Sequence, residues 1–97
     1  MKLSQNQLEN IQKVFDASPV KRAYIFGSFS KGTANESSDI DILVELDYSK
    51  HIGLAFIGLK NKMEEVLEKS VDLVTDKGLS KHILPFVERE KILIYER

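Results

Sequence analysis

The chain has 97 residues, a formal net charge of −1, 42% apolar residues and no cysteine. This length and balance predict one soluble globular domain over residues 1–97, and the lack of cysteine excludes disulfides, thiolate zinc sites and cysteine nucleophiles. The charge gives no basic field for a nucleic-acid backbone, and no signal peptide or apolar run of about 20 residues is evident, so we expect a cytoplasmic protein that binds neither membranes nor nucleic acid directly.

The first two elements have clear boundaries in the sequence. Residues 4–17 are predicted to form a helix, because Ser4 and Gln7 make an S-x-x-Q capping box and Pro19 follows the last turn. The aromatic and β-branched residues 22–26 then predict a strand that closes at Gly27.

The rest of the chain alternates between the two kinds of element. It predicts a turn over 31–38, a strand over 39–46, a helix over 51–69, a strand over 71–74, a helix over 77–90 that contains Pro85, and a strand over 92–95. This order predicts an α/β (α+β) fold with a small mixed sheet of about four strands and helices packed on it.

Two acidic residues interrupt the second predicted strand. Asp39 and Asp41 are two apart, so they point to the same side as Leu43, while Ile40 and Ile42 point to the other. Paired carboxylates repel each other, so either one of them binds a proton with raised affinity or a cation lies between them, for which a hard ion such as Mg²⁺ is suited. The alternative is a strand near an edge with both aspartates solvated.

Asp72 lies in a third apolar strand, where aspartate is disfavoured. If the two strands are neighbours, Asp72 joins Asp39 and Asp41 in one site. Otherwise it points to solvent while Val71 and Leu73 point inward.

Gly27 and Ser28 directly follow a predicted strand. Glycine permits a sharp turn and close approach of a ligand, and a helix that begins at Ser28 would offer free N–H groups to a phosphate. An ordinary turn glycine with a helix cap is the alternative. A P-loop is excluded, because Gly32 is followed by Thr33 without the required lysine.

Gly27-Ser28, the ten residues that follow and Asp39-Ile40-Asp41 resemble the signature of the nucleotidyltransferases related to DNA polymerase β. The small size resembles the minimal nucleotidyltransferases, many of which are antitoxins paired with HEPN-domain toxins. The resemblance implies a polymerase β-like fold, with Asp39, Asp41 and Asp72 as catalytic residues and ligands of two Mg²⁺ ions. It also implies nucleotide binding by Gly27, Ser28 and Lys31, where Lys31 replaces the arginine of many relatives; a solvated loop lysine is the alternative.

The resemblance further implies transfer of AMP from ATP to a hydroxyl, with tyrosine expected, of a HEPN toxin partner that is thereby neutralised. One alternative is a non-catalytic antitoxin that neutralises its partner by covering it. Another is a subunit of a small-molecule or RNA nucleotidyltransferase.

Three further features concern the surface. Residues 52–59 are apolar on all sides, which indicates either a partner interface or a segment tucked into the core. Charged residues around the last strand indicate a protected sheet edge. His51 and His82 are expected at the surface.

Overall fold

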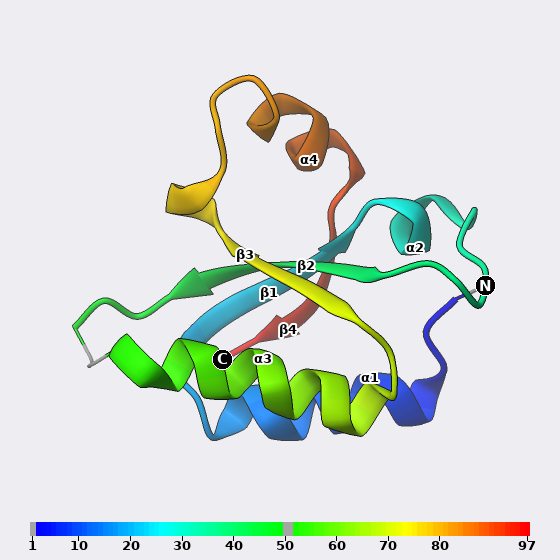
Figure 1. The fold of residues 1–97 in the computed structure, drawn as a ribbon. Helices are drawn as coiled ribbons and strands as arrows, with labels where there is room; N and C mark the ends of the chain where they lie inside the picture. Colours follow the sequence, from blue (N-terminus) through cyan, green and yellow to red (C-terminus); the bar gives the residue numbers. More distant parts are fainter. Residues whose placement is uncertain (1, 50–51) are drawn as a thin grey trace.

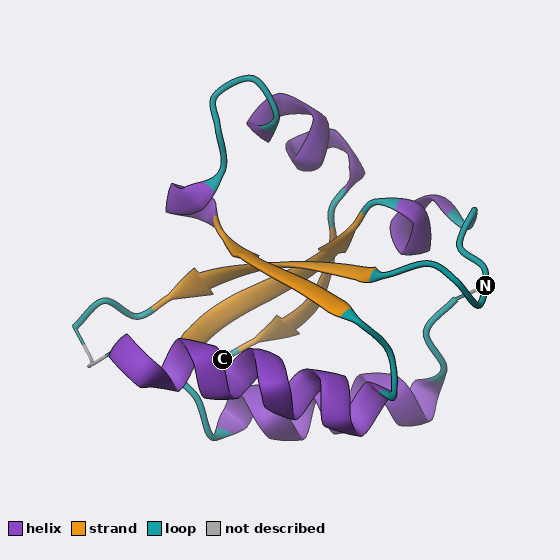
Figure 2. Ribbon diagram, in the orientation of Figure 1, coloured by secondary structure: helices purple, strands orange, loops and turns teal. Residues whose placement is uncertain are grey.

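A four-stranded mixed sheet in the order β3-β2-β1-β4 organises the protein in a computed structural model that describes residues 2–49 and 52–97 (Figures 1 and 2). The elements are α1 (Gln5–Asp16), β1 (Val20–Phe26), α2 (Ser28–Lys31), β2 (Ile40–Leu46), α3 (Gly53–Leu67), β3 (Val71–Thr75), the 3₁₀ turn η1 (Asp76–Gly78), α4 (Leu84–Glu90) and β4 (Ile92–Glu96). β1 is antiparallel to β2 and β4, and α3 connects β2 to its parallel neighbour β3. The predicted fold class is confirmed.

Helix boundaries follow the local chemistry. The predicted capping box is present: the Ser4 hydroxyl accepts from the Gln7 amide, and the Ser4 amide donates to the Gln7 side chain. The helix predicted over 77–90 is wrong in its first half, where η1 and a turn stand. α4 begins only at Leu84, with Pro85 in its first turn, because proline lacks a backbone N–H donor and the N–H groups of the first turn make no hydrogen bond within the helix.

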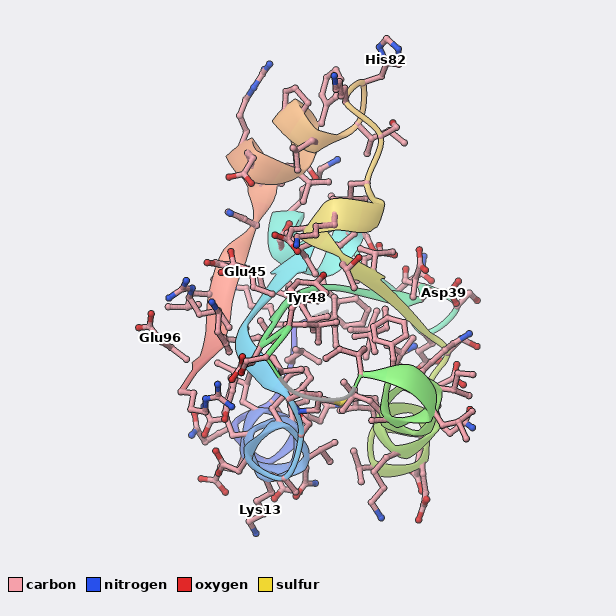
Figure 3. All side chains as sticks on the ribbon, turned by 90° about the vertical axis from the view of Figure 1, so that its left-hand side faces the viewer. Lys13, Asp39, Glu45, Tyr48, His82 and Glu96 are labelled. Atoms are coloured by element: carbon pink, nitrogen blue, oxygen red, sulfur yellow. The ribbon has the colours of Figure 1, made fainter. Side chains whose placement is uncertain are left out.

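The helices lie on both faces of the sheet. α1 and α3 lie side by side under one face, whereas α2 and α4 lie over the other (Figures 1 and 3). The main apolar cluster fills the α1/α3 side, where Ile11, Phe15, Met63 and Ile42 are fully buried. No helix in the described part of the chain is long and apolar enough to span a membrane.

β2 contributes to both faces. Ile40, Ile42 and Val44 belong to the main cluster and are fully buried, as their alternation predicts. Leu43 is also buried but lies outside that cluster. The side of the sheet that carries α2 and α4 is therefore the side toward which Asp41, Leu43 and Glu45 point. We call it the open face.

The apolar stretch predicted over 52–59 divides between core and solvent. Phe56 packs partly against the core and Leu59 is buried, but Leu54 is 84% exposed and Ile57 is 59% exposed. The stretch is therefore not tucked wholly into the core, and its use as a partner interface stays a prediction. The helix predicted from residue 51 begins at Gly53; His51 lies outside the described residues.

Candidate nucleotidyl-transfer site

Three strand ends meet at one end of the sheet. Phe26, the last residue of β1, pairs with Asp41 near the start of β2, and Asp41 pairs with Asp72 near the start of parallel β3. Paired residues on adjacent strands point to the same side, about 5 Å apart. Asp41 and Asp72 are therefore neighbours on the open face, as the sequence predicted if the strands were adjacent.

Asp39 lies one residue before β2 and is exposed. The loop leading to it is held by Lys69, whose ammonium donates to the backbone carbonyls of Glu36 at 2.7 Å and Ser38 at 3.2 Å. Lys69 lies just before β3. Its side chain therefore connects the loop that precedes Asp39 to the segment that precedes Asp72.

Burial and nearby charge both act on the Asp41 carboxyl. Its half-burial raises the pKa above the ordinary value, and the charges of Asp72 and Asp39 raise the pKa further. No ion pair among the described residues involves any of these carboxylates. A cluster of repelling, oxygen-only ligands without a protein cation fits a hard divalent ion such as Mg²⁺.

Within residues 2–49 and 52–97, no three histidine or acidic side chains form an assembled metal-ligand group. Electrostatic coupling thus links Asp39, Asp41 and Asp72, while a common metal site for all three stays a prediction.

Gly27 closes β1 with a backbone that only glycine adopts readily, at φ +71° and ψ −147°. A Cβ added here would collide with the Oδ2 atom of Asp41. The missing side chain therefore lets the turn lie directly against the carboxylate, and it leaves the backbone open to a ligand at that point.

Ser28 is the first residue of α2, the short helix that the sequence allowed for. The amides of Ser30 and Lys31 both donate to the Gly27 carbonyl, at 3.1 and 3.2 Å. The N–H groups at the start of a helix precede its first internal hydrogen bonds, so those of Ser28 and Phe29 remain available for a phosphate next to the carboxylates.

Lys31 ends α2, and its ammonium lies 3.0 Å from the Glu90 carboxylate of α4. Lys31 is exposed, as the alternative of a solvated lysine predicted, although it ends a short helix and has an acidic partner; phosphate binding by Lys31 stays a prediction. Glu90 was not anticipated, because no sequence signal connects residues so far apart. His82 is exposed, as expected (Figure 3).

A family model described as "Polymerase beta, Nucleotidyltransferase" matches residues 9–97. The chain belongs to this nucleotidyltransferase family. The Gly-Ser turn follows β1 and the aspartates lie at the start of β2, while their role as the site stays a prediction. The prediction of a nucleotidyltransferase is confirmed.

Named relatives refine this assignment. A "Putative protein adenylyltransferase" of Methanocaldococcus jannaschii is 52% identical over 56 residues, which cover 58% of this nucleotidyltransferase and 59% of the relative. "Protein adenylyltransferase MntA" of Thermococcus cleftensis is 37% identical over 75 residues, covering 77% of this chain and 75% of that one. The alignment with the Methanocaldococcus jannaschii relative thus spans less than two thirds of that relative's length.

The fold also matches a solved assembly. A structure described as a toxin-antitoxin with AMP-PNP contains a chain with a TM-score of 0.76 and 27% identity, covering 93% of this nucleotidyltransferase and 73% of that chain. These matches bear out the resemblance to minimal nucleotidyltransferases of toxin–antitoxin pairs.

Proposed function

We propose that this nucleotidyltransferase transfers AMP from ATP to a hydroxyl group of a HEPN-type toxin and thereby neutralises it as an antitoxin. The carrying observation is the pairing of Asp41 with Asp72 beside the Gly27-Ser28 turn, which brings carboxylates and backbone donors to one end of the sheet. Relatives named protein adenylyltransferase and a toxin-antitoxin fold neighbour with AMP-PNP support the choice of nucleotide and partner.

Each part of the site has a task in this proposal. The Gly27 backbone and the Ser28 amide and hydroxyl hold the triphosphate, because the glycine leaves room and the helix start supplies donors. Lys31 exchanges its Glu90 partner for a phosphate oxygen when ATP binds.

Asp39, Asp41 and Asp72 form the ligand set for Mg²⁺, which when bound neutralises phosphate charge and polarises the reacting oxygens. Asp41 is held in place by its half-burial and its contact with the glycine turn. Asp72, which is exposed at the same end of the sheet, accepts the proton of the acceptor hydroxyl.

The reaction is a substitution at the α-phosphorus of ATP. The acceptor oxygen forms a bond to that phosphorus, the bond to the bridging oxygen of the β-phosphate breaks, and pyrophosphate leaves with the electron pair. The expected acceptor is a tyrosine. A cytoplasmic location follows from the use of ATP, and with a net charge of −1 we expect no direct nucleic-acid binding.

The test is an intact-mass measurement on the protein purified with its partner. ATP and MgCl₂ are added, with α-labelled and γ-labelled ATP in parallel and EDTA as the control. The proposal predicts that the partner gains one or more AMP masses, with label from the α position only and no gain in EDTA. Transfer of γ-label, or modification of an RNA or a small hydroxyl compound instead of the protein, would contradict it.

A further inference from the structure

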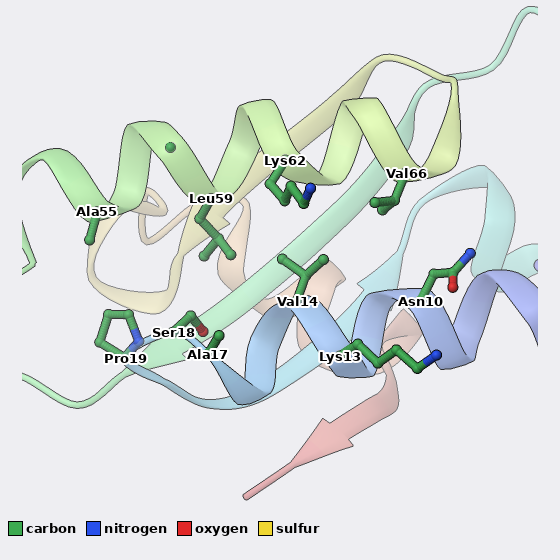
Figure 4. A pocket seen from close by; sticks show the side chains of 11 residues that line it. Asn10, Lys13, Val14, Ala17, Ser18, Pro19, Ala55, Leu59, Lys62 and Val66 are labelled. Carbon is green, nitrogen blue, oxygen red and sulfur yellow. The ribbon is translucent and has the colours of Figure 1, made fainter.

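A groove of about 520 Å³ lies between α1 and α3, on the side of the sheet away from the paired aspartates. Figure 4 shows the side chains that line it. Its walls are mainly small or aliphatic: Val14, Ala17, Pro19, Ala55, Gly58, Leu59 and Val66. From Ala55 to Val66 is about 16 Å along α3, which is three turns of a helix. The groove thus has the length and apolar lining that suit one face of an amphipathic helix.

One residue of the lining, Gly58, has no side chain. A Cβ added at Gly58 would meet nothing within 4 Å. Leu54, one turn away on α3, is 84% exposed and extends the apolar surface beyond the groove. A monomer gains nothing from this exposed apolar area, whereas a docked apolar side chain would bury it.

The charges at the groove have one sign. Lys13 of α1 and Lys62 of α3 are among the lining residues, and no acidic side chain lines it (Figure 4). Lys62 has only a long contact of 3.6 Å with exposed Glu65, and no ion pair of Lys13 occurs among the described residues.

These charges decide between two occupants. In a symmetric dimer formed through this groove, the lysines of both copies would face each other, and like charges oppose such an association. A helix whose apolar stripe is flanked by glutamate or aspartate would instead pair with both lysines.

We infer that the α1/α3 groove is the docking site for an acidic amphipathic helix of the protein partner. In naming the owner of that helix as the protein to be modified, the inference rests on the proposed function. Because the groove and the carboxylates lie on opposite sides of the sheet, the docked helix does not cover the ATP site, and the acceptor hydroxyl reaches the open face from another segment of the partner.

The test uses synthetic probes and needs no ATP, so its failure is distinct from a failure of AMP transfer. Two fluorescent 18-residue helical peptides share a leucine stripe; one has glutamates beside the stripe and the other has lysines. Fluorescence anisotropy measures their binding to the full chain. We expect saturable binding of the glutamate peptide, at least tenfold tighter than the lysine peptide, weakening with added salt.

Three variants locate the binding. Gly58→Leu places a bulky side chain in the groove lining, where a Cβ meets nothing within 4 Å, and should weaken both peptides at least tenfold. Lys13→Glu/Lys62→Glu should reverse the preference between the peptides. Lys60→Glu/Lys81→Glu makes the same change of net charge at exposed lysines outside the groove, and should leave the preference for the glutamate peptide unchanged.

Circular dichroism of each variant verifies its fold. No saturable binding, equal affinity for the two peptides, or equal loss in the groove and control variants would overturn the inference. A dimer in sedimentation experiments that Gly58→Leu dissociates would overturn it in favour of a second copy of the chain.

Discussion

The two faces of β2 differ in burial and in charge. Toward α1 and α3, Ile40, Ile42 and Val44 are fully buried in one apolar cluster. Toward the open face, Asp41 is half-buried against Gly27 and is coupled to two other carboxylates. The apolar face stabilises the folded state. The open face lowers that stability, because it holds repelling carboxylates close together. One seven-residue strand thus separates folding from chemistry by the alternation of its side chains.

The largest effect on stability is expected on the packed face. Phe15→Ala should lower the free energy of unfolding by about 3–5 kcal/mol, because it removes a fully buried ring that packs on Tyr95 with centroids 5.3 Å apart. Urea titration measures the loss. Leu54→Ala, at an 84% exposed position, should change it by no more than about 0.5 kcal/mol; equal losses would contradict burial as the source of the stability that Phe15 supplies.

Gly27 affects both stability and the candidate site. Gly27→Ala should lower the free energy of unfolding by about 1–3 kcal/mol and also reduce AMP transfer, because the new Cβ would collide with Asp41. Gly32→Ala is the matched control. Gly32 also has positive φ, at +77°, but an added Cβ meets nothing within 4 Å. Its loss should come from the backbone alone and leave transfer unchanged. A transfer defect in both variants would assign the effect to the loop rather than to the contact with Asp41.

On the open face, Asp41→Asn should stabilise the protein while it abolishes transfer. Burial and the neighbouring carboxylates raise the pKa of Asp41, so the ionised form destabilises the folded state as the pH rises above the unfolded value of about 3.9. Relief of such strain commonly gives about 0.5–2 kcal/mol, or a few degrees in Tm.

Thermal melts from pH 3 to 7 without divalent ions measure this gain. It should be largest at pH 7 and vanish below pH 3.9. Glu36→Gln, at an exposed carboxylate in the same part of the chain, should give no gain. A loss of stability in Asp41→Asn at pH 7 would show that the carboxylate has a stabilising partner.

The smallest effect is expected far from both faces, at Asp47. Its carboxylate accepts from the hydroxyl and amide of Ser49 at 2.6 and 3.1 Å, and from Arg97 at 2.9 Å, which lowers its pKa to about 2. A lowered pKa adds stability above the unfolded value, and this stability is lost as the pH falls toward 2. The Tm difference between wild type and Asp47→Asn should therefore be small at pH 7 and close to zero at pH 2. A difference that persists at pH 2 would point to neutral hydrogen bonds instead.

The sequence predicted those features that depend on residues close to one another in the chain. Alternation in residues 39–46 predicted which side chains of β2 face the core, and Ser4 with Gln7 predicted the start of α1. The Gly27-Ser28 turn and Asp41 lie in contact and Asp72 is next to Asp41, as the candidate site required, while the role of these residues stays a prediction. The division of the chain into one domain stays a prediction.

What the sequence did not reveal depends on contacts between distant segments. The Lys31–Glu90 ion pair and the role of Lys69 in holding the loop before Asp39 arise only once the strands are in register. The α1/α3 groove likewise depends on how two distant helices pack. Composition over 77–90 was helical throughout, but η1 and the following turn replaced its first half before Pro85.

The separation of binding from chemistry is tested most directly by one double variant. Asp39→Asn/Asp41→Asn is purified with the partner, incubated with ATP and MgCl₂, and examined by intact mass and by size-exclusion chromatography. The account predicts that the complex remains while the AMP gain falls at least 10³-fold, on the order of 4 kcal/mol of lost transition-state stabilisation. An undiminished AMP gain would contradict the assignment of the open face as the catalytic site, and loss of the complex would contradict the separate docking surface.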